Sequence, residues 1–156
     1  MRFGSSHRPF RLAFLTEGGG VTGATWAQGE PRERRAARVA PLPSTLQPRP
    51  EPDPALATRI SAAIAALREG GAALAGAAHV SAGAKRVFAR GTPALRDFAS
   101  ATYLGEEDVT GRGVRRHGGE VSRVRLYRMR TQNGERYLMV HVTADGVVTD
   151  HDVLLR

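Results

Sequence analysis

The chain has 156 residues, a formal net charge of +8 at pH 7 with histidine neutral, and no cysteine. This length allows one domain of ordinary size with an appendage. The lack of cysteine excludes disulfides, thiolate nucleophiles and Cys-ligated metal sites, and the lack of any run of roughly 18 or more apolar residues excludes a transmembrane helix.

The positive charge does not by itself indicate nucleic acid as a partner. All of the 23 basic residues except Lys85 are arginine, and the chain also holds 18 glycines. Such a composition is typical of a GC-rich bacterial genome, in which coding bias adds arginine without any anionic partner selecting it. The sequence therefore argues against nucleic acid as the main partner.

Residues 1–52 are expected to lie outside the folded domain, as a disordered or signal-like leader that continues into a Pro-rich linker. Basic residues, the apolar run 12–15 and small residues at 24–27 resemble an export signal, whereas Glu17 and three glycines interrupt the apolar stretch. We therefore expect an exported protein in preference to a cytoplasmic one. Seven of the nine prolines lie between Pro31 and Pro54, without apolar periodicity, which indicates an extended linker over about 29–52.

An α+β domain is expected over residues 53–156, and it begins with a clear helix. Asp53 is a typical N-cap residue and Pro54 suits the first helical position. An apolar stripe follows at helical spacing, made by Leu56, Ile60, Ile64 and Leu67. Gly70 and Gly71 then stop the helix, so the pattern predicts a helix over 54–69.

The next 30 residues give weaker signals. Helix propensity suggests short helices around 72–79 and 84–89. Thr92 and Pro93, followed by apolar residues on one face, predict a helix of two or three turns ending near Ala101. An edge strand is expected to follow from Tyr103 to Val109.

Three antiparallel strands are expected over 121–130, 136–143 and 147–155. Asn133-Gly134 and Asp145-Gly146, which separate them, are the strongest short-range signals of a hairpin. The fold class is thus α+β, with N-terminal helices packed on one face of a three- to four-stranded antiparallel β-meander.

Alternation along these strands separates a core face from a solvent face. A two-residue turn at Asn133-Gly134 would place Tyr127 opposite Val140. The core face, covered by the helix, is expected to hold Tyr127, Met129, Leu138, Val140 and Val142. Val147, Val153 and Leu155 are expected to extend it from the last strand. The opposite face is expected to be wet and to carry Leu126, Arg128, Arg130, Tyr137, Met139 and His141.

Only one cluster has the residue types of acid–base catalysis. His141 is expected to face Asp150 across the last two strands, with His151 next in the chain. An aspartate beside a histidine can orient and charge it, and the same residue types can bind a metal. A cross-strand His–Asp pair on a solvated face is the more common reason for such an arrangement. No catalytic residue and no metal or other cofactor is therefore assigned.

Arginines are also dense between residues 112 and 136, where a sheet face with interleaved aromatics would suit single-stranded nucleic acid. Alternation scatters most of these arginines over both faces. It leaves a small basic patch of Arg128, Arg130 and Tyr137.

The C-terminal part resembles a known family in its strand, turn and glycine pattern. The matching segments are Gly105-Glu106-Glu107-Asp108-Val109, Val124-Arg125-Leu126-Tyr127, Asn133-Gly134, and Thr143 to Val148 with the end Leu155-Arg156. Over about residues 90–156 it resembles the small α+β domain that follows the catalytic domain of many bacterial β-lactamase-like serine hydrolases. SnoaL-like and ketosteroid-isomerase-like cone folds, which enclose an apolar pocket, have similar sheets. The hydrolase domain itself is missing here, and no G-x-S-x-G, S-x-x-K or H-E-x-x-H motif occurs.

These resemblances imply an accessory or ligand-binding module, with a serine hydrolase or a small apolar ligand as partner. We expect a non-catalytic domain with a modest pocket between Leu56, Ile60, Phe98, Tyr127 and Val140. One alternative is a small ketosteroid-isomerase-like lyase or isomerase that uses His141 or His151 as base. Another is a nucleic-acid-binding module that uses the basic patch. No feature of the sequence indicates an oligomeric state.

Overall fold

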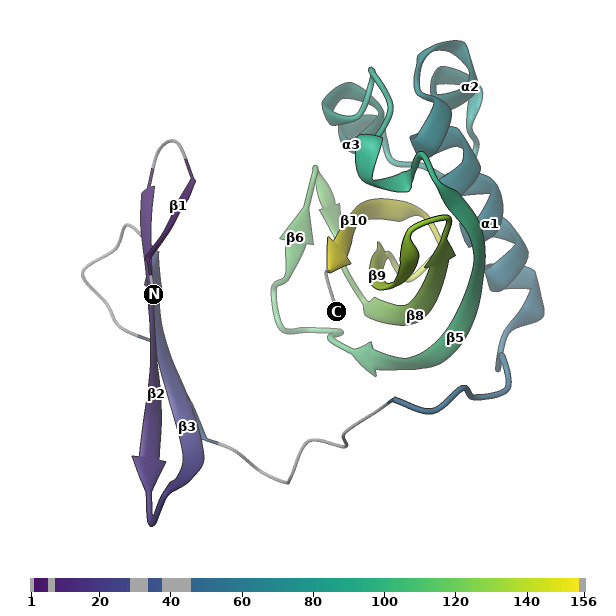
Figure 1. Ribbon diagram of the computed structural model, residues 1–156. Coiled ribbons are helices and arrows are strands. Elements are labelled where there is room, and N and C mark those ends of the chain that lie inside the picture. The colour runs from purple at the N-terminus through teal and green to yellow at the C-terminus, as the bar shows by residue number, and fades with distance from the viewer. Residues whose placement is uncertain (1, 6–7, 29–33, 38–45, 155–156) are drawn as a thin grey trace. The chain divides into compact units, whose positions relative to one another are not determined.

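The computed structural model describes residues 2–5, 8–28, 34–37 and 46–154, and the chain divides into two compact units, 1–45 and 46–156. The boundary therefore lies seven residues before the expected start of the domain at Asp53. Figure 1 shows the elements of each unit.

The first unit contains one antiparallel sheet in the order β1-β2-β3-β4. Its strands are β1 (Arg2–Ser5), β2 (Arg8–Glu17), β3 (Gly20–Gln28) and β4 (Arg34–Ala37). Gly18 and Gly19 form the turn between β2 and β3 with positive φ values of 57° and 80°, as such two-residue hairpin turns require. The pattern of residues 1–52 predicts no strand in this segment. Of the expected linker, residues 29–33 and 38–45 lie outside the described residues.

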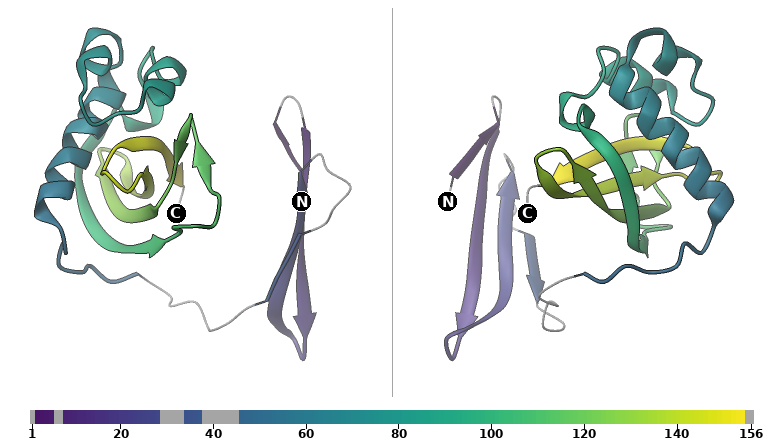
Figure 2. Two further views of the ribbon diagram at one scale, coloured as in Figure 1. Left: turned by 180° about the vertical axis from the view of Figure 1, so that it is seen from behind. Right: turned by 45° about the vertical axis from the view of Figure 1, so that its right-hand side comes forward.

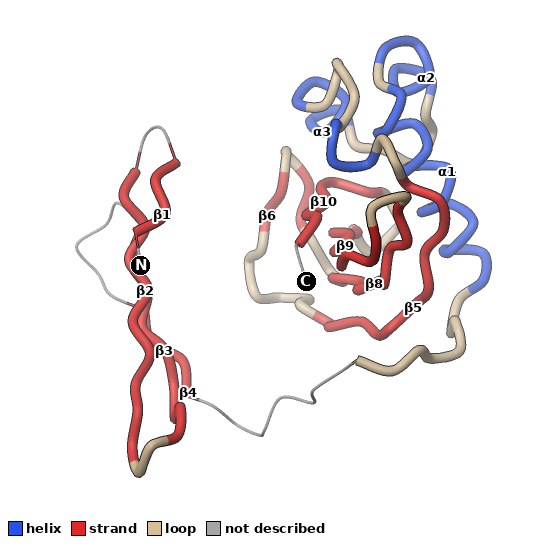
Figure 3. Tube along the Cα trace, in the orientation of Figure 1, coloured by secondary structure: helices blue, strands red, loops and turns tan. Residues whose placement is uncertain are grey.

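The second unit is built on a four-stranded antiparallel sheet in the order β10-β9-β8-β5. Its strands are β5 (Phe98–Asp108), β8 (Arg123–Thr131), β9 (Gly134–Val142) and β10 (Val148–Leu154). The helices lie together on one side of this sheet (Figure 3). The expected α+β class, with helices on one face of a three- to four-stranded antiparallel meander, is confirmed.

Helix α1 (Pro54–Glu69) has the expected bounds and crosses one face of the sheet (Figure 2). The Asp53 carboxylate accepts a hydrogen bond from the Leu56 N–H at 2.9 Å and caps the helix. At the other end Gly70 has φ 70°, and a Cβ there would lie 2.2 Å from the Gly91 nitrogen, so only glycine fits. The expected stripe of Leu56, Ile60, Ile64 and Leu67 is fully buried against the sheet.

The turn between β8 and β9 lies one residue earlier than expected. It consists of Gln132 and Asn133, with Thr131 opposite Gly134. The Thr131 hydroxyl fixes this turn, because it donates to the Gly134 carbonyl at 2.8 Å and accepts from the Asn133 N–H at 3.2 Å. The expected pairing of Tyr127 with Val140 is wrong, since Tyr127 lies opposite Leu138.

The expected core face is nevertheless confirmed. Moving a turn by one residue shifts the strand pairing by two, and a shift of two leaves every side chain on its face. The five buried residues of this face are Tyr127, Met129, Leu138, Val140 and Val142. The opposite face is less wet than expected. Arg130 is exposed, His141 is only 3 % exposed, and the remaining four residues are partly buried, namely Leu126, Arg128, Tyr137 and Met139.

The pairing of β9 with β10 contains a bulge at Thr149. Val148 lies opposite Val142, and Asp150 lies opposite His141 as expected. A bulge adds one residue to β10, so the side chains before it point to the opposite face from the one that simple alternation predicts. Val148 is therefore buried in the core in place of the expected Val147. Val153 packs against the core as expected, and Leu155 lies outside the described residues.

Between α1 and β5 the chain forms only short helical pieces. Helices α2 (Gly71–Gly76) and α3 (Ala82–Val87) agree with the expected short helices. The helix expected over 92–101 is wrong, because a single 3-10 turn, η1 (Pro93–Leu95), is followed two residues later by β5. Pairing of Phe98 with Thr131 and of Ala101 with Met129 outweighs the short helical pattern.

A small hairpin, β6 (Arg115–Arg116) and β7 (Gly119–Glu120), is inserted between β5 and β8. Its turn residue His117 has φ 41° and is the one non-glycine residue with positive φ in the described part of the chain. The hairpin packs closely on α3, because a Cβ on Gly83 would lie 1.7 Å from the His117 carbonyl oxygen. None of the helices in the described residues is long and apolar enough to cross a bilayer.

Candidate functional site

A buried arginine organises one end of the sheet. Arg125 of β8 is 0 % exposed and lies on the core face, two residues before Tyr127. Its Nε donates to Glu106 of β5 at 2.9 Å, and its Nη2 donates to Glu51 at 2.5 Å. A buried cation is tolerated when it is paired and hydrogen-bonded, and these two carboxylates meet that condition.

Two tyrosines complete the surroundings of this arginine. Arg125 Nη1 donates to the Tyr127 hydroxyl at 3.2 Å, and its Cζ lies 4.8 Å from the centre of the Tyr103 ring. The two tyrosine rings meet edge to face with centroids 5.8 Å apart. We call Glu51, Tyr103, Glu106, Arg125 and Tyr127 the arginine cluster.

Burial sets the ionisation of the cluster. It raises the pKa of the Tyr127 phenol to about 12, and it also raises the pKa of Tyr103. Burial alone would lower the pKa of Arg125, but the hydrogen bond and the charge of Glu51 hold that pKa above its ordinary value. At neutral pH the tyrosines therefore stay neutral and the arginine stays charged.

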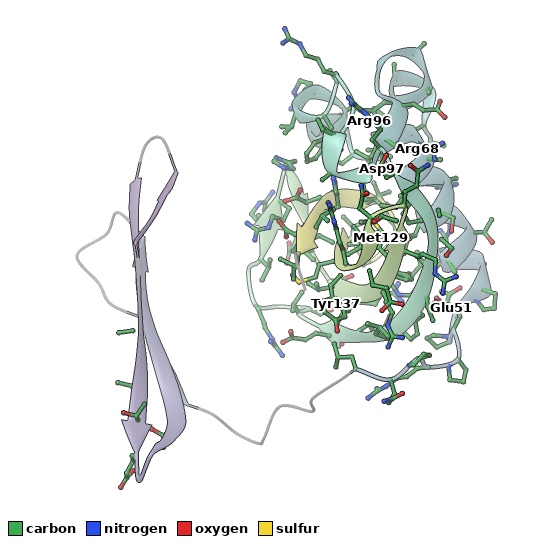
Figure 4. All side chains as sticks on the ribbon, viewed as in Figure 1. Glu51, Arg68, Arg96, Asp97, Met129 and Tyr137 are labelled. Atoms are coloured by element: carbon green, nitrogen blue, oxygen red, sulfur yellow. The ribbon has the colours of Figure 1, made fainter. Side chains whose placement is uncertain are left out.

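Glu51 reaches Arg125 because the chain before α1 wraps around the edge of the sheet. We call residues 46–52 the strap. The Leu46 carbonyl accepts from Arg128 Nη2 at 2.6 Å, and the Arg49 N–H donates to the Tyr103 carbonyl at 3.0 Å. Arg128 and Arg125 point to opposite faces of β8. The strap therefore passes around the edge strand β5 from one face to the other, and Figure 4 shows Glu51 beside β5 near the start of α1.

A groove of about 340 Å³ lies next to the cluster, between α1 and β5. It is lined by Glu51 of the strap, Ala57 and Ser61 of α1, Phe98, Ser100, Ala101 and Tyr103 of β5, and Tyr127 of β8. The concave surface of the groove thus combines the aromatic rings of Phe98, Tyr103 and Tyr127 with the carboxylate of Glu51. The other lining residues are alanines and serines. Such a combination of apolar walls with few placed polar groups is typical of ligand sites.

The groove contains part of the pocket expected from the sequence. Phe98 and Tyr127 line it. Leu56, Ile60 and Val140 do not, since they are at most 3 % exposed inside the packed core beneath α1.

A second hollow of about 340 Å³ lies near the β9–β10 turn. Its lining residues are Thr110, Glu120, Val121, Ser122, Thr143, Ala144 and Asp145. No aromatic side chain is among these described residues, and Thr143 and Asp145 already bond each other. The groove beside the arginine cluster is therefore the stronger candidate.

The histidines and aspartates of the last strands form a separate group. His141 Nε2 lies 2.9 Å from an oxygen of Asp152, not of the directly opposite Asp150. Asp150 instead contacts His117 at 3.3 Å and Arg116 at 3.6 Å, both on the β6–β7 hairpin. Asp150 thus ties that hairpin to β10.

His151 points to the other face of β10 and packs on Phe88, with ring centroids 4.7 Å apart. Burial lowers the pKa of its imidazole, against the opposing charges of Asp150 and Asp152. In the described part of the chain, no group of three or more histidine, cysteine, aspartate or glutamate side chains is arranged to hold a metal ion.

The basic patch is smaller than the sequence predicts. Arg128 lies opposite Tyr137, but its guanidinium already binds the Leu46 carbonyl of the strap. Arg130 is exposed on the same face and lies opposite Glu135. Of the two arginines of the patch, Arg130 is therefore the one that is exposed, while Arg128 is partly buried and bonded to the strap.

Sequence reasoning missed the arginine cluster, although one signal for it exists. Side chains two residues apart in a strand point to the same face, as those of Arg125, Tyr127 and Met129 do in β8. Because Tyr127 and Met129 were expected in the core, Arg125 should have been expected there too. A buried arginine then requires a carboxylate. No local pattern identifies Glu51 as that carboxylate, because it lies 74 residues away in a Pro-rich segment.

Comparison of the chain with family models, with curated proteins and with solved structures finds no match. The geometry of the groove is therefore the basis for assigning a function.

Proposed function

We propose that residues 46–156 form a non-catalytic binding module whose groove between α1 and β5 takes a small ligand. The observation that carries this proposal is the groove of about 340 Å³ in which two of the three aromatic walls, Tyr103 and Tyr127, contact a fully buried arginine. Ligand sites are concave, largely apolar, and oriented by a few polar groups, and the groove has these three properties.

The arginine cluster is better explained by binding than by stability. Taking a guanidinium and two carboxylates out of water costs several kcal/mol per ion, and well-packed apolar side chains often replace such networks without loss of stability. Arg125 fixes Tyr127, Tyr103 and Glu51, all of which line the groove. A site whose walls are fixed in advance loses less entropy on binding.

The ionisation of the groove supports a role without catalysis. A general base works best when its pKa lies near the operating pH. The phenols of Tyr103 and Tyr127 have raised pKa values and stay protonated, and the Glu51 carboxylate accepts from Arg125. None of the described residues that line the groove is His141, Asp150 or His151, on which the isomerase alternative depends.

The nucleic-acid alternative gains less support. Nucleic acid binding relies on arginines and lysines that can reach phosphates. Arg130 is the exposed arginine of the patch, and Arg128 is partly buried with its Nη2 donating to the strap, so the arginines of the patch are only partly accessible to phosphates. The association with a serine hydrolase, and export with it, rest on the resemblance of residues 90–156 alone and stay proposals.

A fragment screen on the ¹⁵N-labelled full chain tests the binding proposal. Small amphipathic aromatic compounds such as 2-phenylethanol are expected to shift the amide signals of Ala101, Tyr103 and Ser61, which lie at the groove. Ser61→Phe fills the groove and should weaken binding at least about tenfold. Ala62→Phe adds the same ring to an exposed position on α1 that does not line the groove, and serves as the matched control. Shifts confined to other parts of the chain, or equal binding by both variants, would contradict the proposal.

A further inference from the structure

The charge of the groove points to the class of ligand. Glu51 is the one charged side chain among the described residues that line it, whereas Arg125 is 0 % exposed beneath it. Arg125 with Glu51 and Glu106 sums to a net charge of −1, from one guanidinium and two carboxylates. We infer that the groove selects a small organic cation, an amine carried on an apolar or aromatic body. This inference rests on the proposed binding function.

Glu51 has an oxygen available for an ammonium group. Its Oε1 accepts from Arg125 Nη2 at 2.5 Å and from the Asp53 N–H at 3.1 Å. Within the described part of the chain, both of these bonds use Oε1 and leave Oε2 for a further donor. The Glu51 side chain is partly exposed, at 22 %, and lines the groove, so an ammonium donor can approach this oxygen. A charge-assisted hydrogen bond of this kind is about twice as strong as a neutral one.

The aromatic walls favour the same ligand. A cation within about 6 Å of a ring centre is attracted by the negative face of the ring. One face of the Tyr103 ring is already occupied by Arg125, whose Cζ lies 4.8 Å from the ring centre. Phe98 and Tyr127 add two further rings beside Glu51. At pH 7 both phenols are protonated, so the neutral rings of Tyr103 and Tyr127 can contact the apolar body of the ligand.

An anionic ligand does not fit the same groove. The Nε, Nη1 and Nη2 atoms of Arg125 all donate to partners of the cluster, namely Glu106, Tyr127 and Glu51. The remaining N–H groups of Arg125 lie on a side chain that is 0 % exposed, so a carboxylate ligand could reach them only by displacing Glu51. Such a ligand would then also face the like charge of Glu106, which is costly at low dielectric. The net charge of +8 on the whole chain acts against cations, but salt screens it beyond about 8 Å at physiological ionic strength.

Three probes of similar shape test the inference on the full chain at pH 7: 2-phenylethylamine, 2-phenylethanol and 3-phenylpropionate. Titration followed by ¹⁵N chemical shifts should show the amine binding at the groove at least about tenfold more tightly than the alcohol, with the carboxylate weakest. Added salt should weaken binding of the amine and leave the alcohol unchanged.

Glu51→Gln removes the charge and should reduce the preference for the amine over the alcohol to about twofold. Glu107→Gln is the matched control, since Glu107 lies on β5 outside the groove and pairs with exposed Arg112. It should leave the preference unchanged. If Glu51→Gln does not fold, the three-probe and salt series on the unmodified chain decide the matter.

The outcomes separate the two proposals. Equal binding of amine and alcohol at the groove, or tighter binding of the carboxylate, overturns the selection for a cation and leaves the binding module in place. Binding of none of the three probes at the groove overturns both.

Discussion

At the scale of single residues, Arg125 shows how one side chain ties distant parts of the sequence together. The guanidinium is fully buried and bonds a carboxylate 74 residues earlier and another 19 residues earlier. Removing one partner of a buried ion pair leaves an uncompensated charge, which costs more than removing the whole pair. The ion pair of Glu51 with Arg125 is therefore one of the long-range contacts that hold the strap against the sheet, beside those of Leu46 and Arg49.

His151 gives a prediction for pH. Burial lowers the pKa of this imidazole, so the folded state keeps it neutral at pH values where the unfolded chain already binds a proton. Its contribution to stability is therefore complete above the unfolded pKa of 6.5 and is lost as the pH falls below that value. One such group changes the free energy of unfolding by at most about 1.4 kcal/mol per pH unit.

The variant His151→Phe should reduce this acid sensitivity. Its ring can keep the contact with Phe88, and it carries no titrating group near His117, His141, Asp150 and Asp152. Urea denaturation at pH 7 and pH 5 measures the loss of stability for each protein. We expect a smaller loss for the variant, and an equal loss in both would show that His151 does not cause the acid sensitivity.

At the scale of elements, the β6–β7 hairpin and α3 depend on one close contact. A Cβ on Gly83 would lie 1.7 Å from the His117 carbonyl oxygen, so the two backbones can approach only because residue 83 is glycine. His117 has a positive φ of 41° at this contact, and its Nε2 lies 3.3 Å from Asp150.

Gly83→Ala should therefore destabilise the protein by about 1–3 kcal/mol, since overpacking forces the backbone to move. Gly76→Ala is the matched control, because a Cβ on Gly76 of α2 would meet no atom within 4 Å. This control should be neutral or stabilising by up to about 1 kcal/mol. Urea denaturation measures both variants, and equal effects would contradict the close contact.

Elements with a complete local signal could be predicted from the sequence. Helix α1 has an N-cap, an apolar stripe and a glycine stop, and its bounds are as expected. The core face of β8 and β9 was also predictable, because alternation survives an error of one residue in the turn. The helix expected over 92–101 failed because three apolar residues cannot outweigh pairing of β5 with β8.

The candidate site was predictable only in part. Phe98 and Tyr127 were expected near a pocket, and both line the groove. Glu51 and Tyr103 could not be assigned to it, because their place depends on contacts between the strap, β5 and Arg125. The sequence correctly predicted that His141 lies opposite Asp150 in the paired strands. The His141 side chain, however, forms its hydrogen bond with Asp152, two residues further along β10.

At the scale of the whole molecule, the domain boundary follows from the strap. The Pro-rich composition predicts a linker up to about residue 52, and the helix cap at Asp53 marks an abrupt start of order. The second compact unit instead begins at Leu46, because the strap is bonded at Leu46, Arg49 and Glu51. Composition describes the average tendency of a segment, and a few long-range contacts can override it.

Truncated chains test this boundary. A chain of residues 46–156 keeps all three strap contacts, whereas a chain of residues 53–156 keeps α1 and the sheet but leaves Arg125 with Glu106 as its remaining carboxylate. We expect the shorter chain to be less stable by about 2–4 kcal/mol, since a buried charge loses a partner. Urea denaturation measures the difference, and Glu51→Gln within residues 46–156 separates the loss of charge from the loss of the strap backbone. Equal stability of the two truncated chains would place the boundary at residue 53 and remove Glu51 from the description of the groove.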